Sequence, residues 1–246
     1  MMRHFIYNCL LSGITPFAKW WLGRNLRHRP LQARFYPEVP PSGVGGIWIH
    51  ACSVGEVMAA QALLSRIRRE QPEWPVLLTV STIAGREIAE NKLPDTAITW
   101  LPFDTLKSVR RFVQMVRPQV LVLVETEIWP NLVREVKKSG ASVVVVNGRI
   151  SARSLPRFIR FRALFAPAFA ALDRVAVQNQ EYKDRFERLG ASPDRVRIAG
   201  CMKFDAVACE VDAKKRLALR VACGYAPDQP LLVFGSTRPG EVSWRP

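Results

Sequence analysis

From about residue 47 onward, short runs of apolar and β-branched residues alternate with longer stretches of helical periodicity. Two runs, 120–124 (VLVLV) and 143–146 (VVVV), are apolar without interruption. Strands with no polar side belong to parallel sheets that helices cover on both faces, because neither face meets water. We therefore expect an α/β fold with a doubly wound, Rossmann-like parallel sheet. The runs assigned to its strands are 47–50, 76–81, 98–101, 120–125, 142–147, 174–178 and 195–200.

A second α/β domain is expected to begin near the end of the sequence. A helical pattern covers 211–221, and 230–236 (PLLVFGS) has the composition of an apolar strand followed by a turn. The ten residues that follow are too few for another sheet. We divide the chain into a basic anchor (1–36), a Pro- and Gly-rich linker (37–46), a Rossmann-like domain (47–205), and a hinge with the start of a second domain (206–246).

The charge indicates an anionic partner, and the cysteines and histidines indicate no metal. The chain has 36 Lys and Arg against 21 Asp and Glu, a net charge of +15, which concerns partners and not the fold. Five cysteines without a CxxC pair predict neither a disulfide framework nor a zinc ribbon, and three scattered histidines predict no histidine metal site. We expect a reducing compartment, no metal and no cofactor. No nucleic-acid-binding motif accompanies the charge, so nucleic acid is not an expected partner.

The first 36 residues combine an apolar stretch with positive charge only. Residues 5–22 approach the roughly 20 residues that a bilayer-crossing helix needs, although polar residues interrupt them. Trp20 and Trp21 stand where interfacial aromatic residues are common. We expect a retained anchor that faces anionic headgroups, with a surface-docking helix as the alternative. The basic residues after it are Arg24, Arg27, His28, Arg29 and Arg34.

Residues 53–56 (SVGE), directly after the first predicted strand, form the first candidate site. Ser, two residues and Glu make a capping box, so the simplest interpretation is a helix start. In open α/β sheets, however, the loops after the strands line the ligand crevice. There Gly55 would let a substrate approach the backbone, and Glu56 would act as a general base toward a hydroxyl. The two interpretations are compatible.

A thiol nucleophile is a weaker hypothesis for the same loop. Cys52 follows a strand and precedes a helix, a place where the pKa of a thiol can be lowered. His50 lies two residues earlier on the same side of the strand. No partner carboxylate is identifiable from the sequence, so we favour a buried structural cysteine.

Residues 120–131 (VLVLVETEIWPN) form the second candidate site. Glu125 and Glu127 end an apolar strand, and a period of two would direct both into the crevice. Pro130 is expected to open the next helix, and Trp129 to pack there as core. The alternative for the glutamates is that they are solvated charges at a helix start.

Basic residues after the next strand form the third candidate site. Spacings of three or four along 147–165 would place several arginines on one helix face, suited to bidentate contacts with phosphate. A solvated basic face is the alternative. The five arginines are Arg149, Arg153, Arg157, Arg160 and Arg162. Arg86 stands near another strand end, and Lys203 at the expected hinge.

These segments together resemble the Kdo (3-deoxy-D-manno-octulosonic acid) transferases of lipopolysaccharide assembly, which have a GT-B fold. No single motif carries the resemblance, which extends over most of the chain. Its segments are the basic apolar N-terminus, WIHACSVGE, LLTVSTIAGRE, LPFD, ETEIWPN, NGRIS, GCMKFD and GSTRPGE. The resemblance implies an enzyme at the cytoplasmic face of the inner membrane that transfers Kdo from CMP-Kdo to a lipid A precursor, with inversion and without a metal.

By this resemblance, Glu56 matches the proposed catalytic base, and Lys203 lies in the interdomain stretch. The expected acceptor-binding residues are Ser53, Gly55, Arg86, Glu125, Glu127 and Arg149. The pattern does not decide which of Glu125 and Glu127 is essential. It leaves open the number of Kdo residues added, the oligomeric state, and whether the N-terminal helix spans the membrane or lies on it.

The sequence departs from the family pattern at Cys52 and after Glu241. In GT-B enzymes the C-terminal domain supplies most of the nucleotide-sugar site, so we expect a truncated chain that docks the acceptor and turns over poorly. Two alternatives remain open. One is a GT-B transferase with a different donor, and the other is a basic, non-enzymatic module that binds acidic membranes.

Overall fold

The computed structural model describes residues 2–25, 27–206 and 212–235. Two compact units divide the chain, Met1–Ala206 and Val207–Pro246. In the second unit, residues 212–235 contain one helix, α9 (Ala213–Ala222). The expected GSTRPGE turn lies outside the described residues after Gly235.

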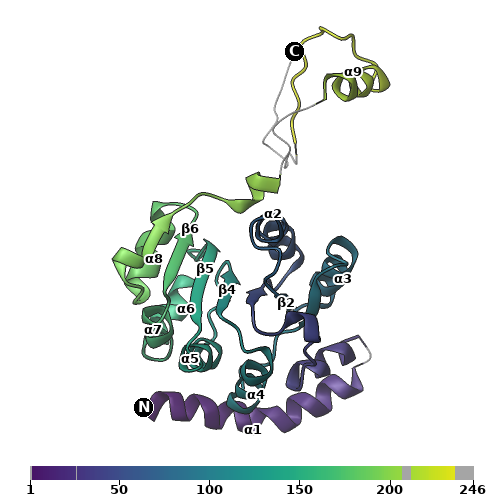
Figure 1. The fold of residues 1–246 in the computed structure, drawn as a ribbon. Helices are drawn as coiled ribbons and strands as arrows, with labels where there is room; N and C mark the ends of the chain where they lie inside the picture. The colour runs from purple at the N-terminus through teal and green to yellow at the C-terminus, as the bar shows by residue number, and fades with distance from the viewer. Residues whose placement is uncertain (1, 26, 207–211, 236–246) are drawn as a thin grey trace. The chain divides into compact units, whose positions relative to one another are not determined.

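A seven-stranded parallel sheet forms the centre of the first unit (Figure 1). Its strand order is β3-β2-β1-β4-β5-β6-β7, which confirms the predicted doubly wound α/β fold. Each of the seven strands predicted for this sheet is present, within two residues at its ends. The strands are β1 (Ile47–His50), β2 (Val76–Val80), β3 (Ala97–Trp100), β4 (Val120–Val124), β5 (Ser142–Gly148), β6 (Arg174–Val177) and β7 (Val196–Ile198).

Helices cover both faces of the sheet (Figure 1). Neighbouring residues of one strand enter different hydrophobic clusters because successive side chains point to opposite faces. Trp48 packs with Phe112 in one cluster, and Ile49 packs with Leu78 in the other. The helices of this unit are α1 (Met2–Arg24), α2 (Val54–Glu70), α3 (Ile83–Lys92), α4 (Leu106–Val116), α5 (Pro130–Lys138), α6 (Leu155–Arg160), α7 (Arg162–Ala170) and α8 (Gln180–Leu189). Short 3-10 helices are η1 (Arg29–Phe35), η2 (Pro41–Gly43), η3 (Pro193–Arg195) and η4 (Met202–Ala206).

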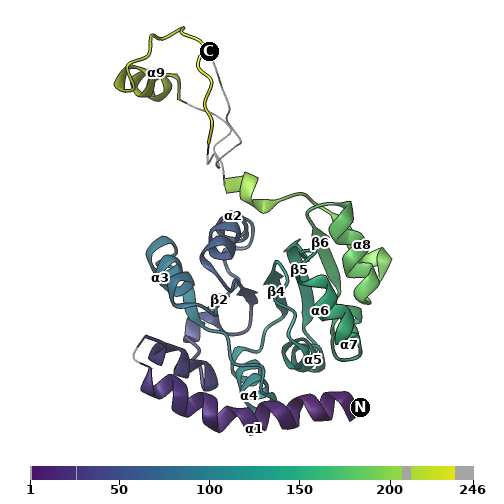
Figure 2. The same cartoon turned by 180° about the vertical axis from the view of Figure 1, so that it is seen from behind.

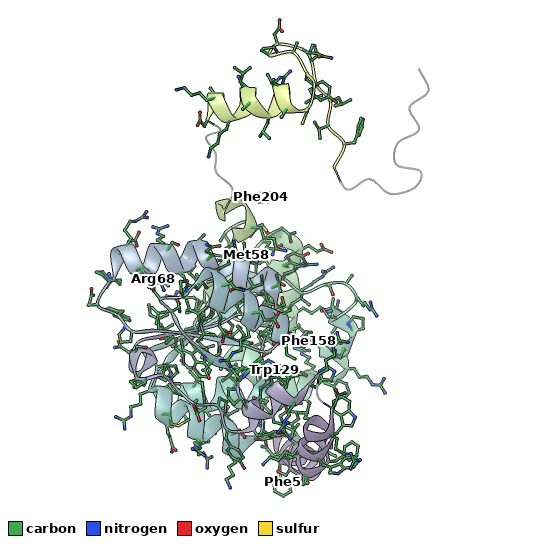
Figure 3. The ribbon with its side chains drawn as sticks, turned by 90° about the vertical axis from the view of Figure 1, so that its right-hand side faces the viewer. Phe5, Met58, Arg68, Trp129, Phe158 and Phe204 are labelled. Atoms are coloured by element: carbon green, nitrogen blue, oxygen red, sulfur yellow. The ribbon has the colours of Figure 1, made fainter. Side chains whose placement is uncertain are left out.

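The N-terminal helix α1 runs along one end of the first unit, beside α4, in both views (Figures 1 and 2). Two polar contacts attach it: the Tyr7 hydroxyl donates to Asp104 Oδ2 at 2.9 Å, and Asn131 Nδ2 donates to Asn8 Oδ1 at 2.7 Å. Its other side leaves large apolar side chains exposed, among them Phe5 (Figure 3). Within the described residues, no helix has both the length and the hydropathy needed to cross a bilayer.

Two predictions of local structure were wrong. Residues 230–235 form no strand, because a strand needs a neighbour to complete its hydrogen bonds and none of the described residues pairs with this segment. The basic stretch 147–165 is not one helix either. Arg149 and Arg153 precede α6, and the chain leaves helical geometry at Phe161, so only Arg157 and Arg160 share α6.

Candidate active site

The order of the strands places a ligand crevice between β1 and β4. From β1 the chain continues outward through β2 and β3, and from β4 it continues the other way through β5, β6 and β7. In open α/β sheets, ligands bind at the carboxyl ends of the strands where the order reverses in this way. The loops after β1 and β4 carry the two predicted acidic sites. The fold therefore brings residues 53–56 and 125–131 to one corner.

Glu56 lies in the first turn of α2, and its carboxylate bonds to the loop before the helix. Oε2 accepts the Cys52 backbone N–H at 2.8 Å, and Oε1 accepts the Ser53 hydroxyl at 2.9 Å. Only 9% of the residue is exposed. This burial raises the pKa of Glu56, although the two hydrogen bonds oppose the shift. A carboxylate with a raised pKa is a better proton acceptor, which suits a general base.

Neither hydrogen bond of the predicted capping box forms: the Glu56 carboxylate accepts the N–H of Cys52, one residue before the N-cap, and not the N–H of Ser53. Ser53 stands at the N-cap of α2, as expected, and the Glu56 carboxylate returns to the start of the helix. The Ser53 hydroxyl, however, accepts no backbone N–H and instead donates to Glu56. The Ser53 side chain therefore orients the Glu56 carboxylate and does not cap the helix.

Glu127 lies in the loop after β4, where side chains from three elements surround its carboxylate. The indole N–H of Trp129 donates to Oε2 at 3.0 Å, and His50 Nε2 lies 3.6 Å from the same oxygen. Burial would raise the pKa of Glu127, but His50, Trp129 and the positive charge of Arg34 outweigh it and lower that pKa. With 23% of its side chain exposed, Glu127 is an accessible anion.

His50 connects the two acidic loops from inside the sheet. It is completely buried, and its Nδ1 donates to the Thr79 carbonyl of the neighbouring strand at 3.0 Å. The other ring nitrogen, Nε2, makes no hydrogen bond within the described residues and faces Glu127. His50 therefore positions Glu127, and no nearby thiolate uses it as a base.

The thiol hypothesis for Cys52 is disfavoured by its surroundings. Burial, together with the negative charges of Glu127 and Glu56, raises the pKa of Cys52 to about 12. A thiol with that pKa stays protonated at neutral pH, and the thiolate is the nucleophilic form. Cys52 contributes its backbone N–H to Glu56 instead.

Arg34 belongs to this site and not to a surface that faces headgroups, so its assignment to the basic anchor was wrong. Its Nε donates to the Leu101 carbonyl at 3.0 Å and its Nη1 to the Ser81 carbonyl at 3.3 Å, at the ends of β3 and β2. Burial lowers its pKa to about 10, which leaves it charged at neutral pH. Phe35, which is buried against Phe103, is the sequence signal that this segment docks inward.

Glu125 and Arg149 come to the same corner by their backbones. The φ of Glu125 is 63°, so the extended strand ends before it and the alternation that was expected to align it with Glu127 does not continue. Its N–H donates to the Val146 carbonyl at 2.9 Å. Arg149 is exposed, and its carbonyl accepts the Thr126 hydroxyl of the Glu127 loop.

The structure does not bring Arg86 into contact with these carboxylates within the described residues. Its guanidinium pairs with Glu90 at 2.7 Å and lies 4.9 Å from the centre of the Trp100 ring. A neighbour that the sequence reasoning missed contributes instead. The Thr82 hydroxyl donates to the Cys52 carbonyl at 2.9 Å and accepts the Gly85 N–H at 3.1 Å, which fastens α3 to the Glu56 loop.

Lys203 is exposed on η4, which packs against α2. Asn147, at the end of β5, helps to hold this segment in place. Its Oδ1 accepts the Met202 N–H at 3.2 Å and the Gln178 side-chain amide at 2.9 Å. These bonds fix Met202 to the sheet, and Lys203 is the next residue along the chain.

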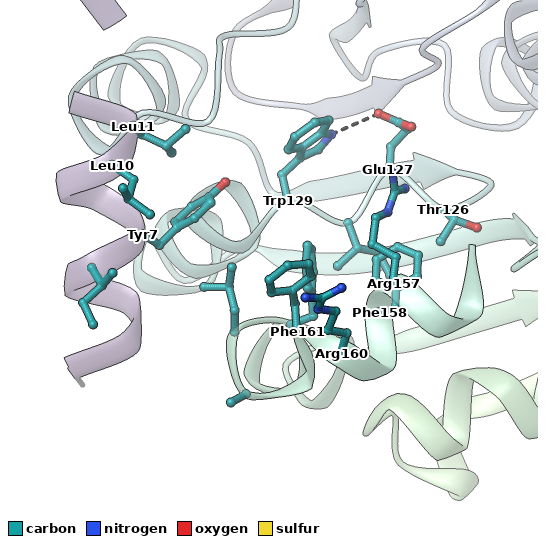
Figure 4. A pocket seen from close by; sticks show the side chains of 15 residues that line it. Tyr7, Leu10, Leu11, Thr126, Glu127, Trp129, Arg157, Phe158, Arg160 and Phe161 are labelled. Atoms are coloured by element: carbon teal, nitrogen blue, oxygen red, sulfur yellow. Dashed lines mark hydrogen bonds between the residues drawn. The ribbon is translucent and has the colours of Figure 1, made fainter. Parts of the chain in front are cut away.

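A large cavity of about 830 Å³ lies between α1, the α6–α7 segment and the loop after β4 (Figure 4). Most of its lining is apolar, and Trp129 belongs to this wall, not to the core, with 37% of the residue exposed. Glu127, Arg157 and Arg160 supply charged groups. Glu56 is not among the lining residues.

A metal site needs several ligand side chains gathered around one ion. Within residues 2–25, 27–206 and 212–235, no three His, Cys, Asp or Glu side chains gather as a bound ion would require. The polar groups that the corner offers are carboxylates, hydroxyls and guanidinium groups.

Comparison with known proteins identifies the family. The family model described as 3-deoxy-D-manno-octulosonic-acid transferase (kdotransferase) matches residues 25–206. The chain belongs to this family. Both carboxylates of the corner, Glu56 and Glu127, lie within the matched region.

Curated relatives include 3-deoxy-D-manno-octulosonic acid transferases from two organisms. That of Haemophilus influenzae is 29% identical over 98% of this chain and 58% of its own length. That of Chlamydophila psittaci is 32% identical over 100% of this chain and 59% of its own length. A bifunctional glycosyltransferase/methyltransferase of Fusobacterium nucleatum is 33% identical over 79% of this chain and 31% of its own length. The chain thus spans less than two thirds of the length of each of these relatives.

Solved structures share the fold at low sequence identity. A UDP-N-acetylglucosamine 2-epimerase superposes with a TM-score of 0.51 at 10% identity, over 71% of this chain and 55% of that one. The UDP-GlcNAc 2-epimerase of Neisseria meningitidis, bound to UDP-GlcNAc, gives 0.50 at 9% identity, over 73% and 51%. These likenesses show the GT-B-type fold alone.

Proposed function

We propose that this chain forms the acceptor side of a glycosyltransferase that moves Kdo from CMP-Kdo to a sugar hydroxyl of a lipid A precursor. Its membership of the Kdo transferase family supports the reaction class. The observation that carries the proposal is the pair of carboxylates at the switch point. Glu56 has a raised pKa, and Glu127 has a lowered pKa and lines an open cavity.

In the proposed reaction, Glu56 takes the proton of the acceptor hydroxyl as its oxygen attacks the anomeric carbon of Kdo from the face opposite CMP. The bond from that carbon to the CMP phosphate oxygen breaks, and CMP leaves with the electron pair. The anomeric centre inverts because one displacement occurs, and the scheme needs no metal. Positive groups are required beside the departing phosphate. Lys203, on η4, is our candidate for contact with the donor side.

Acceptor recognition is proposed for the polar groups around this corner. Ser53 holds the Glu56 carboxylate, and Gly55 adds no side chain at the exposed start of α2. Glu127, Glu125 and Arg149 border the neighbouring loop and supply both signs of charge. A role for Arg86 in acceptor binding stays a prediction, because its guanidinium group is paired with Glu90.

We also propose that α1 lies on the cytoplasmic face of the inner membrane and contacts anionic lipids. Support comes from the exposed apolar side chains on α1 and from the exposed Arg24, Arg27 and Arg29 that follow them. Such a helix binds by burying apolar area and by electrostatic attraction. Flotation with vesicles, with and without an anionic lipid, tests this placement.

The function is tested by measuring two quantities for one variant. In a protein that joins this chain to a donor-binding domain, Glu56→Gln should lower Kdo transfer from CMP-Kdo to tetra-acylated lipid A precursor by about 100-fold or more, since a positioned base supplies that much. Binding of the radiolabelled acceptor should change by less than about twofold. Glu73→Gln, at an exposed glutamate after α2, is the matched control and should change neither quantity. A basic membrane-binding module without enzymatic function would be insensitive to both substitutions, and that result would refute the proposal.

A further inference from the structure

We propose that the cavity beside Glu127 receives an acyl chain of the acceptor, and that Arg157 and Arg160 bind a phosphate of the same molecule. The ligand class is an acylated, phosphorylated amphiphile. This inference rests on the proposed function for the identity of the acceptor, and extends it by naming where the lipid part binds.

The lining of the cavity fits an apolar chain. Its walls come from α1, from α6 and α7, and from the loop after β4, and its volume of about 830 Å³ is typical of a small-molecule site. Four large apolar residues that line it are well exposed: Ile6 at 49%, Leu10 at 60%, Trp129 at 37% and Phe161 at 51%. An exposed apolar wall of this kind marks a binding surface.

The charged lining residues lie where a phosphorylated headgroup would need them. Arg157 and Arg160 are three residues apart on α6 and therefore project from neighbouring positions on one side of the helix. Both are exposed, and neither has an acidic partner within the part of the chain that the structure describes. Two unpaired guanidinium groups are suited to a phosphate.

The two ends of the cavity differ in polarity. In Figure 4 its lining extends from Leu10 and Leu11 on α1, past Trp129, to Glu127 and Arg157 at the other end. The apolar end is built on the helix whose outer side carries Phe5 and Phe17, both exposed. A lipid with its acyl chain toward α1 would place its polar sugar near Glu127 and the switch point.

Calorimetric titration of the chain with dodecyl phosphate below its micelle concentration tests the site without any sugar donor. Dodecyl maltoside supplies the same alkyl tail without a phosphate, and inorganic phosphate supplies the anion without a tail. We expect saturable binding of dodecyl phosphate, weaker binding of the maltoside by about tenfold, and no saturable binding of inorganic phosphate.

Two alanines of α7 provide a matched pair of variants. Ala163 lines the cavity, whereas Ala170, exposed near the other end of the same helix, does not. Ala163→Phe should weaken dodecyl phosphate binding by about tenfold or more, and Ala170→Phe by less than about twofold. Ile6→Trp, on the opposite wall, repeats the test should Ala163→Phe fail to fold. The double variant Arg157→Gln, Arg160→Gln should lose the preference for phosphate over maltoside.

Undiminished binding by both Ala163→Phe and Ile6→Trp would overturn the inference, as would an unchanged phosphate preference in the arginine variant. Saturable binding of inorganic phosphate as tight as that of dodecyl phosphate would overturn it too, because the site would then be an anion site without a place for a tail. The titration is independent of Kdo transfer. If Glu56→Gln loses Kdo transfer but dodecyl phosphate does not bind, the proposed function is kept and the inference about the acyl chain is rejected.

Discussion

The buried imidazole of His50 lies with its Nε2 3.6 Å from Oε2 of the Glu127 carboxylate and joins the ends of β1 and β4. His50 is fixed in turn by the Thr79 carbonyl on β2. Three strands therefore determine the position and charge of one acidic group. This arrangement explains why the pKa of Glu127 is lowered in a place where burial alone would raise it.

We predict that His50→Phe raises the pKa of Glu127. The aromatic ring keeps most of the buried volume but removes the interaction with the carboxylate, so burial acts with less opposition. Carboxyl-carbon NMR titration of Glu127 measures the shift. Trp129→Phe, which removes the indole hydrogen bond to Glu127, should raise the pKa by less. An unchanged pKa in His50→Phe would show that Arg34 and Trp129 account for the lowering.

Gly85→Ala and Gly55→Ala should change stability in opposite directions. A Cβ at Gly85 would lie 2.7 Å from Thr82 Oγ1 and 3.0 Å from the Cys52 carbonyl, so α3 must move away from the Glu56 loop, at a cost of about 1–3 kcal/mol. A Cβ at Gly55 meets nothing within 4 Å, and alanine in a helix is favoured by about 1 kcal/mol. Urea denaturation of the two variants measures both effects.

The same Gly55→Ala variant tests the predicted approach of the acceptor to the backbone. Acceptor affinity should fall although the protein is more stable, because the new methyl group occupies open space at the start of α2. Equal affinity in native protein and variant would remove Gly55 from the acceptor site.

Arg34→Lys should destabilise the fold and leave membrane binding unchanged. Lysine cannot reproduce the two carbonyl contacts of the planar guanidinium, or its stacking 4.3 Å from the centre of the Phe103 ring. We expect a loss of about 1–3 kcal/mol in urea denaturation. Arg27→Gln, at an exposed arginine, should do the opposite: stability is retained and vesicle binding weakens. Weaker vesicle binding in Arg34→Lys would indicate that Arg34 contacts the membrane.

The sheet was predictable because its signal is local. Uninterrupted apolar runs such as 120–124 identify buried parallel strands, because helices cover both faces of such a sheet. The strand at 230–235 was wrong because an apolar run predicts a strand only where a neighbour exists to pair with it.

The site was predictable only in part because its key contacts join segments far apart in sequence. Glu56 and Ser53 are neighbours along the chain, and their contact was expected, although with the donor and acceptor roles changed. His50 and Glu127 meet only because β1 lies beside β4, and Arg34 reaches them from a segment before the sheet. The periodicity of apolar residues does not indicate which segments distant in the sequence will contact one another. The sequence also gave no indication of the left-handed conformation of Glu125, which ends the alternation on which its direction was predicted.

Asp104 links the attachment of α1 to pH. Its carboxylate accepts the Tyr7 hydroxyl at 2.9 Å and the N–H groups of Asn131 and Leu132 at 3.0 and 2.8 Å at the start of α5. Burial nevertheless raises its pKa from 3.8 to about 7. The folded state then holds the proton more tightly than the unfolded chain. Stability from this group is therefore complete below about pH 4 and is lost as pH rises through about 7, by at most about 4 kcal/mol.

Tyr7→Phe should consequently be more damaging above neutral pH than below it. The Tyr7 hydroxyl favours the charged form of Asp104, so its removal raises the pKa of Asp104 further, and the added cost falls on the ionised state. Urea denaturation should show a larger loss of stability at about pH 8 than at about pH 5, with a difference of about 1–2 kcal/mol. Tyr36→Phe removes a hydroxyl that contacts Lys19 on the surface and makes no contact with Asp104, so its effect should be the same at both pH values. Equal losses for Tyr7→Phe at both pH values would mean that Asp104 keeps an ordinary pKa and that the α1 attachment is insensitive to pH.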